Sequence, residues 1–304
     1  MAIRKSKKNK KQRISFRHGA SKVKKRQKTS RSGPDLIRLL KILSIACAVA
    51  VIGLLLIYAE KSIKTRNGPV ILIDAPEWVT EQLKGKILSK AGGRTFRLDD
   101  EAARLVAENL KASVWLDDIR TQTTDKSIDV RARFRKPVAV IKSGLSPFYV
   151  DSEQVVIDYV PMPHLLIVEI RGLTPVAIMP KFGQVWHRDD LNAAIILIDR
   201  INRRDRIETS VKPLLSEIAA IDVSNYHGRK NSSGPHIVFY TNDNIEIQWG
   251  AEWDAWQKYL ESTDEEKLAK LYGYYKENGT LSGRVQYINL RDPRDNIPLP
   301  IDRY

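Results

Sequence analysis

The sequence predicts an α+β protein that begins with one transmembrane helix and continues with two small domains. Three observations lead to this prediction. Residues 42–59 are 18 consecutive uncharged residues, basic residues are concentrated before this run, and strand-like stretches alternate with helical ones after it. We expect a β-α-α-β-β order in the first domain and a mixed α/β second domain whose sheet is mostly antiparallel.

The positive charge lies in the first 41 residues. They hold 16 of the 51 Lys and Arg residues and one of the 36 Asp and Glu residues, so the rest of the chain holds 35 of each. This composition predicts a disordered cytoplasmic tail over residues 1–35. Three roles stay open for the tail: setting the topology while contacting anionic lipid headgroups, binding nucleic acid, or docking a partner.

The uncharged run Ile42–Ala59 predicts a membrane-spanning helix over residues 36–59. At about 1.5 Å per residue the run covers roughly 27 Å, and Leu39 and Leu40 extend it to the roughly 30 Å of a bilayer core. A cleaved signal peptide is disfavoured, because its charged region would be 41 residues long and no cleavage site follows. The basic side is expected in the cytoplasm, which places the carboxyl-terminal part outside.

A polar linker over residues 60–69 precedes the first domain, which we expect over residues 70–142. Val79, Leu83 and Ile87 recur at helical spacing, and Asp99 is expected to cap a second helix. The face of this second helix is expected to consist of Leu105, Val106, Asn109 and Leu110. The other elements are expected strands at 70–74, near residue 96, at 114–124 and at 127–142.

The second domain is expected over residues 145–291, followed by a tail over residues 292–304. Thr263 and Glu266 form a capping box for a helix over 264–276. The loop 227–235 is expected to be exposed and mobile. The other expected elements are a hairpin at 148–158, strands at 165–172, 217–224, 236–241, 245–249 and 284–290, and a helix at 190–201.

The chain lacks the usual patterns of catalytic and metal sites. Its five histidines have no metal-binding spacing, Cys47 is the only cysteine, and no Gly-rich nucleotide loop occurs. The acidic pairs at 99/100 and 189/190 are better explained as helix starts than as acid/base dyads. Trp249, Trp253 and Trp256 are better explained by packing than by ligand binding. We therefore expect no enzyme, catalytic residue, metal, cofactor or small-molecule substrate.

Several short motifs follow one another in order along residues 35–295. They are Ser113–Leu116 with Ile119, Arg135–Ala139, Tyr149–Asp151 with Val155 and Val156, Gly172, Ile221–Val223, Gly250 and Tyr287–Arg291. Together with the basic tail and the single span, they resemble the FtsQ/DivIB family of bacterial cell-division proteins, in which a POTRA domain precedes a β domain. The residues that match the motif of the POTRA domain are Trp115, Arg135, Lys136, Pro137, Val138 and Ala139. The sequence departs from the family at Gln154, at Asn289 and in the charged stretch 203–212.

The resemblance implies a non-enzymatic scaffold of septum assembly, in the cytoplasmic (inner) membrane at the division site. Its expected partners are small bitopic coiled-coil proteins of the FtsB and FtsL type, other membrane proteins of the divisome, and the lipids around the span and the tail. We expect a partner segment to add as a strand to an open edge of the β domain. The residues expected to carry this edge are Tyr287, Ile288, Asn289, Leu290 and Arg291.

Two other functions stay open. A POTRA-bearing accessory of polypeptide transport or outer-membrane assembly would share the first domain, and the expected β domain argues against it. A membrane-anchored cell-wall enzyme would need a nucleophile or a metal constellation in residues 70–291, and no such pattern occurs there.

Overall fold

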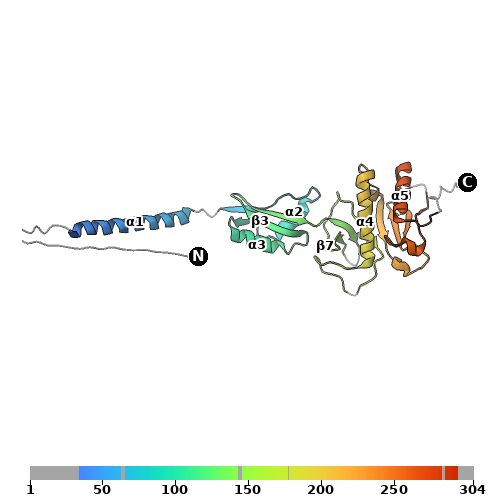
Figure 1. Cartoon of the computed structure of the whole chain (residues 1–304), viewed down its shortest axis with the longest axis horizontal. Helices are drawn as coiled ribbons and strands as arrows, with labels where there is room; N and C mark the ends of the chain where they lie inside the picture. Colours follow the sequence, from blue (N-terminus) through green and yellow to red (C-terminus); the bar gives the residue numbers. More distant parts are fainter. Residues whose placement is uncertain (1–33, 63–65, 143–145, 177, 283–284, 294–304) are drawn as a thin grey trace, which may run out of the picture. The chain divides into compact units, whose positions relative to one another are not determined.

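The computed structural model describes residues 34–62, 66–142, 146–176, 178–282 and 285–293 (Figure 1). The predicted basic tail, except for its last two residues, and the end of the chain from residue 294 lie outside the described residues. The chain divides into two compact units, Met1–Lys64 and Thr65–Tyr304, and each is described by itself.

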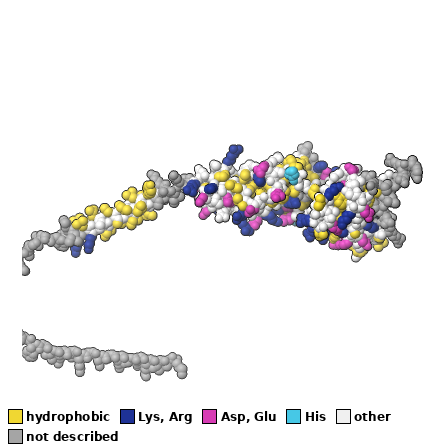
Figure 2. Space-filling model, turned by 90° about the horizontal axis from the view of Figure 1, so that it is seen from above, with side chains coloured by type: hydrophobic (Ala, Val, Ile, Leu, Met, Phe, Trp, Pro, Cys, Tyr) yellow, Lys and Arg dark blue, Asp and Glu magenta, His cyan; other side chains and the backbone are white. Residues whose placement is uncertain are grey.

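The first unit contains the helix α1 (Pro34–Ser62). Within it, Arg38–Tyr58 is long and apolar enough to cross a membrane, as predicted from the sequence. Hydrophobic side chains cover this helix in Figure 2. The helix extends three residues beyond the predicted span and takes up the start of the predicted linker.

The second unit begins with a four-stranded mixed sheet and two helices. The sheet order is β2-β1-β4-β3, in which the central strands β1 and β4 are parallel and the outer pairs are antiparallel. The bounds are β1 (Asn67–Leu72), α2 (Glu81–Ser89), β2 (Thr95–Arg97), α3 (Asp100–Leu110), β3 (Leu116–Thr123) and β4 (Ile128–Phe134).

Local signals place these helices as predicted, with one exception. The Asp99 carboxylate accepts a hydrogen bond from the Ala102 amide at 2.8 Å and so caps α3. Ala103, Val106 and Leu110 form the buried face of α3. The prediction that Leu105 belongs to this face is wrong, since Leu105 is exposed. Residue 105 lies about 100° around the helix from residue 106, which points into the core.

A larger sheet of eight strands follows, in the order β12-β11-β10-β9-β8-β5-β6-β7. Four of its neighbouring pairs are antiparallel and three are parallel, so the sheet is more mixed than predicted. The strands are β5 (Pro137–Ile141), β6 (Phe148–Asp151), β7 (Val156–Asp158), β8 (Val168–Arg171), β9 (Ile218–Asp222), β10 (Ile237–Thr241), β11 (Glu246–Gly250) and β12 (Tyr287–Asn289).

The chain passes from the smaller sheet to the larger one between β4 and β5. Sequence reasoning treated residues 127–142 as one extended stretch of the first domain. In the structure Arg135 and Lys136 interrupt the stretch, and β5 pairs with β6 and β8 of the larger sheet. Pro137 is the first residue of β5, a position where its missing amide costs no ladder hydrogen bond.

Two helices, α4 (Asp189–Glu208) and α5 (Asp264–Asn278), pack on the larger sheet (Figure 1). The predicted capping box of α5 is present, because the Thr263 side chain and the Glu266 side chain each bond the other residue's backbone amide. The helix α4 continues to Glu208, seven residues beyond its predicted end. The ion pairs Arg203–Asp199 and Arg204–Glu208, each four residues apart, support this extra length.

Candidate functional site

The strand β12 is an outer strand of the larger sheet among the residues that the structure describes. It runs parallel to β11, with Asn289 opposite Gln248. The Leu290 amide donates to the Gln248 carbonyl at 3.1 Å. Because the main-chain groups of successive residues in a parallel strand point to opposite sides, those of Asn289 point away from β11. The Arg291 amide, beyond the strand, donates to Asn289 Oδ1 at 3.0 Å.

The side chains of the predicted binding edge divide into two groups. Ile288 and Leu290 are fully buried in the core of the larger sheet, where they hold β12 in place. Tyr287 is 42% exposed. Arg291 lies beyond the strand, and its guanidinium bonds Glu261 at 2.8 Å. Fewer residues of the predicted edge therefore face outward than the sequence suggested, and they centre on Tyr287 and Asn289.

The opposite edge of the sheet, at β7, is covered by the chain itself. The Gly183 amide donates to the Val156 carbonyl at 2.7 Å, and the Val156 amide donates to the Gln184 carbonyl at 2.9 Å. The segment that supplies Gly183 and Gln184 is part of the connection between β8 and α4. The two outer strands of the sheet thus differ, because only β7 is paired with a described loop.

A buried ion cluster connects the end of β12 to α5. The Glu261 carboxylate accepts hydrogen bonds from Lys267 Nζ at 2.7 Å and from Arg291 Nε at 2.8 Å. It also accepts one from the Ala251 amide at 2.8 Å. The Lys267 side chain is 0% exposed and its ammonium lies 5.2 Å from the centre of the Trp249 ring. Sequence reasoning missed this cluster, although a lysine beside the apolar stripe of α5 was a possible signal for a buried partner.

The family-motif residues lie where the two sheets of the second unit meet. Trp115 is buried and its ring contacts Tyr149 of β6 edge to face, with centroids 6.3 Å apart. The Arg135 amide donates to the Trp115 carbonyl at 2.9 Å. Lys136 is exposed, while Pro137 and Ala139 are buried in β5 and Val138 packs against the core of the larger sheet. The motif residues Trp115 and Arg135–Ala139 therefore connect the two sheets, and this connection is called the joint below.

Charged side chains add to this joint. The Arg135 guanidinium bonds Asp151 at 3.0 Å and contacts Glu153 and Asp117 at 3.3 Å each. Hydrogen bonds from Arg133 hold the pKa values of Asp117 and Glu153 below their usual range. An open groove of about 420 Å³ lies beside the joint, with Arg133, Glu153 and other charged residues in its wall. Many of these charges are paired with one another and not aimed at a ligand.

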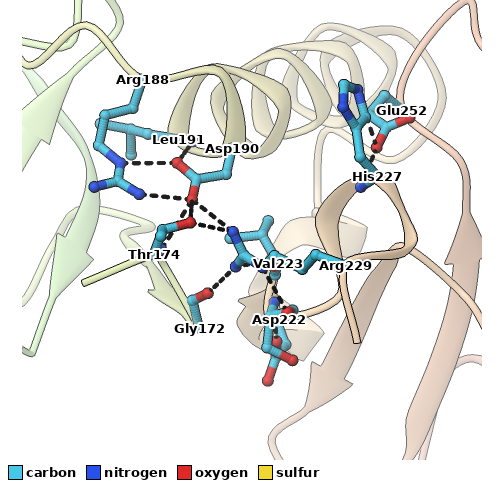
Figure 3. A network of polar contacts seen from close by, with 11 residues as sticks. Gly172, Thr174, Arg188, Asp190, Leu191, Asp222, Val223, His227, Arg229 and Glu252 are labelled. Atoms are coloured by element: carbon cyan, nitrogen blue, oxygen red, sulfur yellow. Dashed lines mark hydrogen bonds and ion pairs between the residues drawn. The ribbon is translucent and has the colours of Figure 1, made fainter. Parts of the chain in front are cut away.

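The crevice at the carboxyl ends of the parallel strands β8 and β9 is the usual place for a small ligand in such a sheet. Here the Arg229 side chain bonds the residues that follow both strands, as Figure 3 shows. The guanidinium bonds the Gly172 and Val223 carbonyls and the Asp190 carboxylate. Burial alone would raise the pKa of Asp190, but hydrogen bonds from Arg188 and other groups lower it well below its usual range.

The same contacts anchor the loop that was expected to be mobile. Arg229 holds its first part, and the His227 amide donates to the Glu252 carboxylate at 3.0 Å (Figure 3). His236, at the end of the loop, is buried with Nδ1 3.2 Å from Glu252. The contacts of Arg229, His227 and His236 are each made by a single residue, and no local sequence pattern predicts them.

Chemistry-bearing residues do not gather elsewhere in the described chain. No group of three or more His, Cys, Asp or Glu residues that could hold a metal ion occurs among the described residues. The pair Asp99 and Asp100 starts α3, and Asp189 and Asp190 start α4, as the sequence suggested. Trp249 stacks between Phe239 and Trp253 in the core, in line with the packing interpretation.

Comparison with known proteins adds no assignment. No family model matches the chain, and no curated protein is significantly similar to it in sequence.

Proposed function

We propose that this chain is a membrane-anchored, non-enzymatic scaffold of bacterial cell division, of the FtsQ/DivIB type. Its span would hold it in the cytoplasmic (inner) membrane, with the second unit outside. It would bind a segment of a small bitopic division protein, of the FtsB or FtsL type, as an added strand beside β12. The difference between the two outer strands of the larger sheet carries the proposal: a loop pairs with β7, whereas no described strand pairs with β12 on the side opposite β11.

The rigidity of β12 supports strand addition. Its core side chains Ile288 and Leu290 are fully buried, and Arg291 is tied to Glu261. A strand whose position is fixed in advance loses little conformational entropy when a partner pairs with it. Main-chain hydrogen bonds then supply affinity, and side chains such as Tyr287 supply selectivity.

The smaller sheet is consistent with the POTRA domain in this proposal. Two helices lie between β1 and β3 in the chain, and β1 pairs in parallel with β4. The observed order is β-α-β-α-β-β, which matches the predicted β-α-α-β-β order when the short edge strand β2, also expected near residue 96, is left out. A scaffold function also agrees with the ion pairing of Arg229 inside this crevice and with the motif residues that connect the two sheets.

The proposal predicts that changes at the β12 edge weaken partner binding. Tyr287→Ala removes the exposed ring. Asn289→Pro removes an amide that points away from β11, together with the side-chain oxygen that accepts from the Arg291 amide, while the Leu290 amide that bonds Gln248 is kept. Each should lower, by about tenfold or more, the amount of the host's FtsB-type protein that copurifies with the full chain, since tenfold corresponds to about 1.4 kcal/mol.

Tyr159→Ala is the matched control, because Tyr159 is 44% exposed, close to the value for Tyr287, but follows β7 at the other end of the sheet. It should leave copurification unchanged. Normal binding by both β12 variants would overturn strand addition at this edge.

A further inference from the structure

The open groove of about 420 Å³ beside the joint has no part in the proposed strand addition. Its wall consists mainly of residues 133–138 around the start of β5, residues 151–153 after β6, residues 164–166 before β8, and the part of α4 between residues 198 and 206. Its volume falls in the range of about 300–1,000 Å³ that is usual for ligand sites.

The acidic residues in the wall of the groove all have cationic partners. The guanidinium of Arg135 contacts Asp151 at 3.0 Å and Glu153 at 3.3 Å. Asp199 pairs with Arg203 at 2.8 Å. Because each carboxylate already faces a guanidinium, the groove is not suited to a cationic ligand.

Two cations in the wall have no such partner. The side chains of Lys136 and Arg206 make no ion pair or hydrogen bond within the described part of the chain. They come from different elements, Lys136 from the turn before β5 and Arg206 from α4. Asn202, one helical turn before Arg206, adds a side-chain amide that is also without a partner among these residues. The groove thus presents unpaired hydrogen-bond donors that complement negative charge.

The groove has apolar surface as well. Leu166 in its wall is 46% exposed, and the nearly fully buried side chains of Ile198 and Leu215 also line it. A small anion such as phosphate would use the cations but leave this apolar surface in water. An acidic peptide can use both, because its carboxylates meet the cations while an apolar side chain covers the leucine.

We propose that this groove binds an acidic segment of a protein. The carboxylates of the segment pair with Lys136 and Arg206, Asn202 bonds its main chain, and an apolar side chain covers Leu166. The site is separate from the proposed strand addition and does not rest on it, since β8, β9, β10 and β11 lie between β5 and β12 in the sheet. It gives the chain a second contact with other proteins, beside the joint.

The test is photocrosslinking with the purified full chain in nanodiscs of zwitterionic lipid. A photoreactive phenylalanine analogue replaces Leu166, and the probe is a short labelled peptide that contains only glutamate and leucine. We expect a labelled adduct, and a yield lower by about fivefold or more when glutamine replaces every glutamate of the probe. The basic tail also attracts acidic peptides, but only a peptide held at position 166 is recorded.

Charge variants complete the test. Lys136→Gln combined with Arg206→Gln removes both unpaired charges, and it should lower the adduct yield by about fivefold or more while thermal unfolding stays unchanged. The matched control is Lys90→Gln combined with Arg94→Gln, which removes one lysine and one arginine at exposed positions after α2, outside the groove. This control should give the normal yield.

Several results would overturn the proposal. One is the absence of any adduct, and another is an equal yield with the analogue at position 105, where Leu105 is 53% exposed on α3. Equal yields from the two charge variants would show that Lys136 and Arg206 do not select the peptide. Inorganic phosphate that suppresses the adduct as strongly as unlabelled peptide, at equal concentration and ionic strength, would indicate a site for small anions only. Each of these results leaves strand addition at β12 standing.

Discussion

At the scale of single residues, buried charge organises the end of β12. Moving Lys267 and Glu261 out of water is costly, and their pairing offsets the cost only because the geometry is close. The carboxylate also takes the space beside Gly250, whose φ is 96°, and a Cβ atom built there would overlap Glu261. Glycine is therefore needed at position 250 for two reasons: the backbone is left-handed there, and the Glu261 carboxylate occupies the space of a Cβ atom.

Gly250→Ala should destabilise the second unit by roughly 3 kcal/mol, because the methyl group adds overpacking to the cost of the left-handed backbone. Gly279→Ala is the matched control. Gly279 has φ 70°, and no heavy atom lies within 4 Å of a Cβ atom built there, so only the backbone cost of about 1–2 kcal/mol applies. Urea unfolding of the fragment 65–304 checks the difference, and equal losses would show that Glu261 does not crowd residue 250.

The sequence could predict Gly250 as a turn glycine but not its second role. The motif that contains it names only the local turn, whereas Glu261 is reached through a contact eleven residues away.

At the scale of elements, helix-capping signals predicted the structure most accurately. The capping box at Thr263 and the cap at Asp99 are local, so the sequence alone sets them. Strand partners depend on long-range pairing, which explains why β5 was grouped with the wrong sheet. The parallel pairing of β8 and β9 has a signal that went unused: the long connection through α4 between them favours a parallel crossover.

The first residue of α5 makes the stability of the second unit depend on pH. Burial raises the pKa of Asp264 to about 6, and one of its carboxylate oxygens is buried without a hydrogen-bond partner. The folded state thus holds the proton more tightly than the unfolded chain, whose pKa is near 3.8. The stability from this group is fully present below about pH 4 and is lost as the pH rises to about 6.

Asp264→Asn should therefore raise the free energy of unfolding at pH 8 by about 1–2 kcal/mol and change it little at pH 4. The asparagine oxygen can still accept the hydrogen bond that the Asp254 amide donates at 2.7 Å. Urea unfolding of the fragment 65–304 at both pH values measures the difference. An equal effect at pH 4 and pH 8 would contradict the assignment.

At the scale of the whole molecule, the sequence predicted the kinds of structure better than their connections. It predicted one span-length helix, which is present, and two small domains after it; the structure has two mixed sheets with helices there, within one compact unit. The joint at Trp115 and Arg135 was visible only as a motif, because its partners Tyr149, Asp151 and Glu153 lie on the other sheet. The proposed binding role of β12 rests on the contrast between two outer strands, which requires the full sheet order.

The central claim is that β12 binds a small division protein outside the membrane. The most direct test is photocrosslinking in living cells, with a photoreactive phenylalanine analogue at position 287 of the full chain and, as the control, at position 159. The account predicts an adduct with the host's FtsB-type protein from position 287 and none from position 159. Adducts with this protein from position 159 alone, or from neither position, would contradict the account.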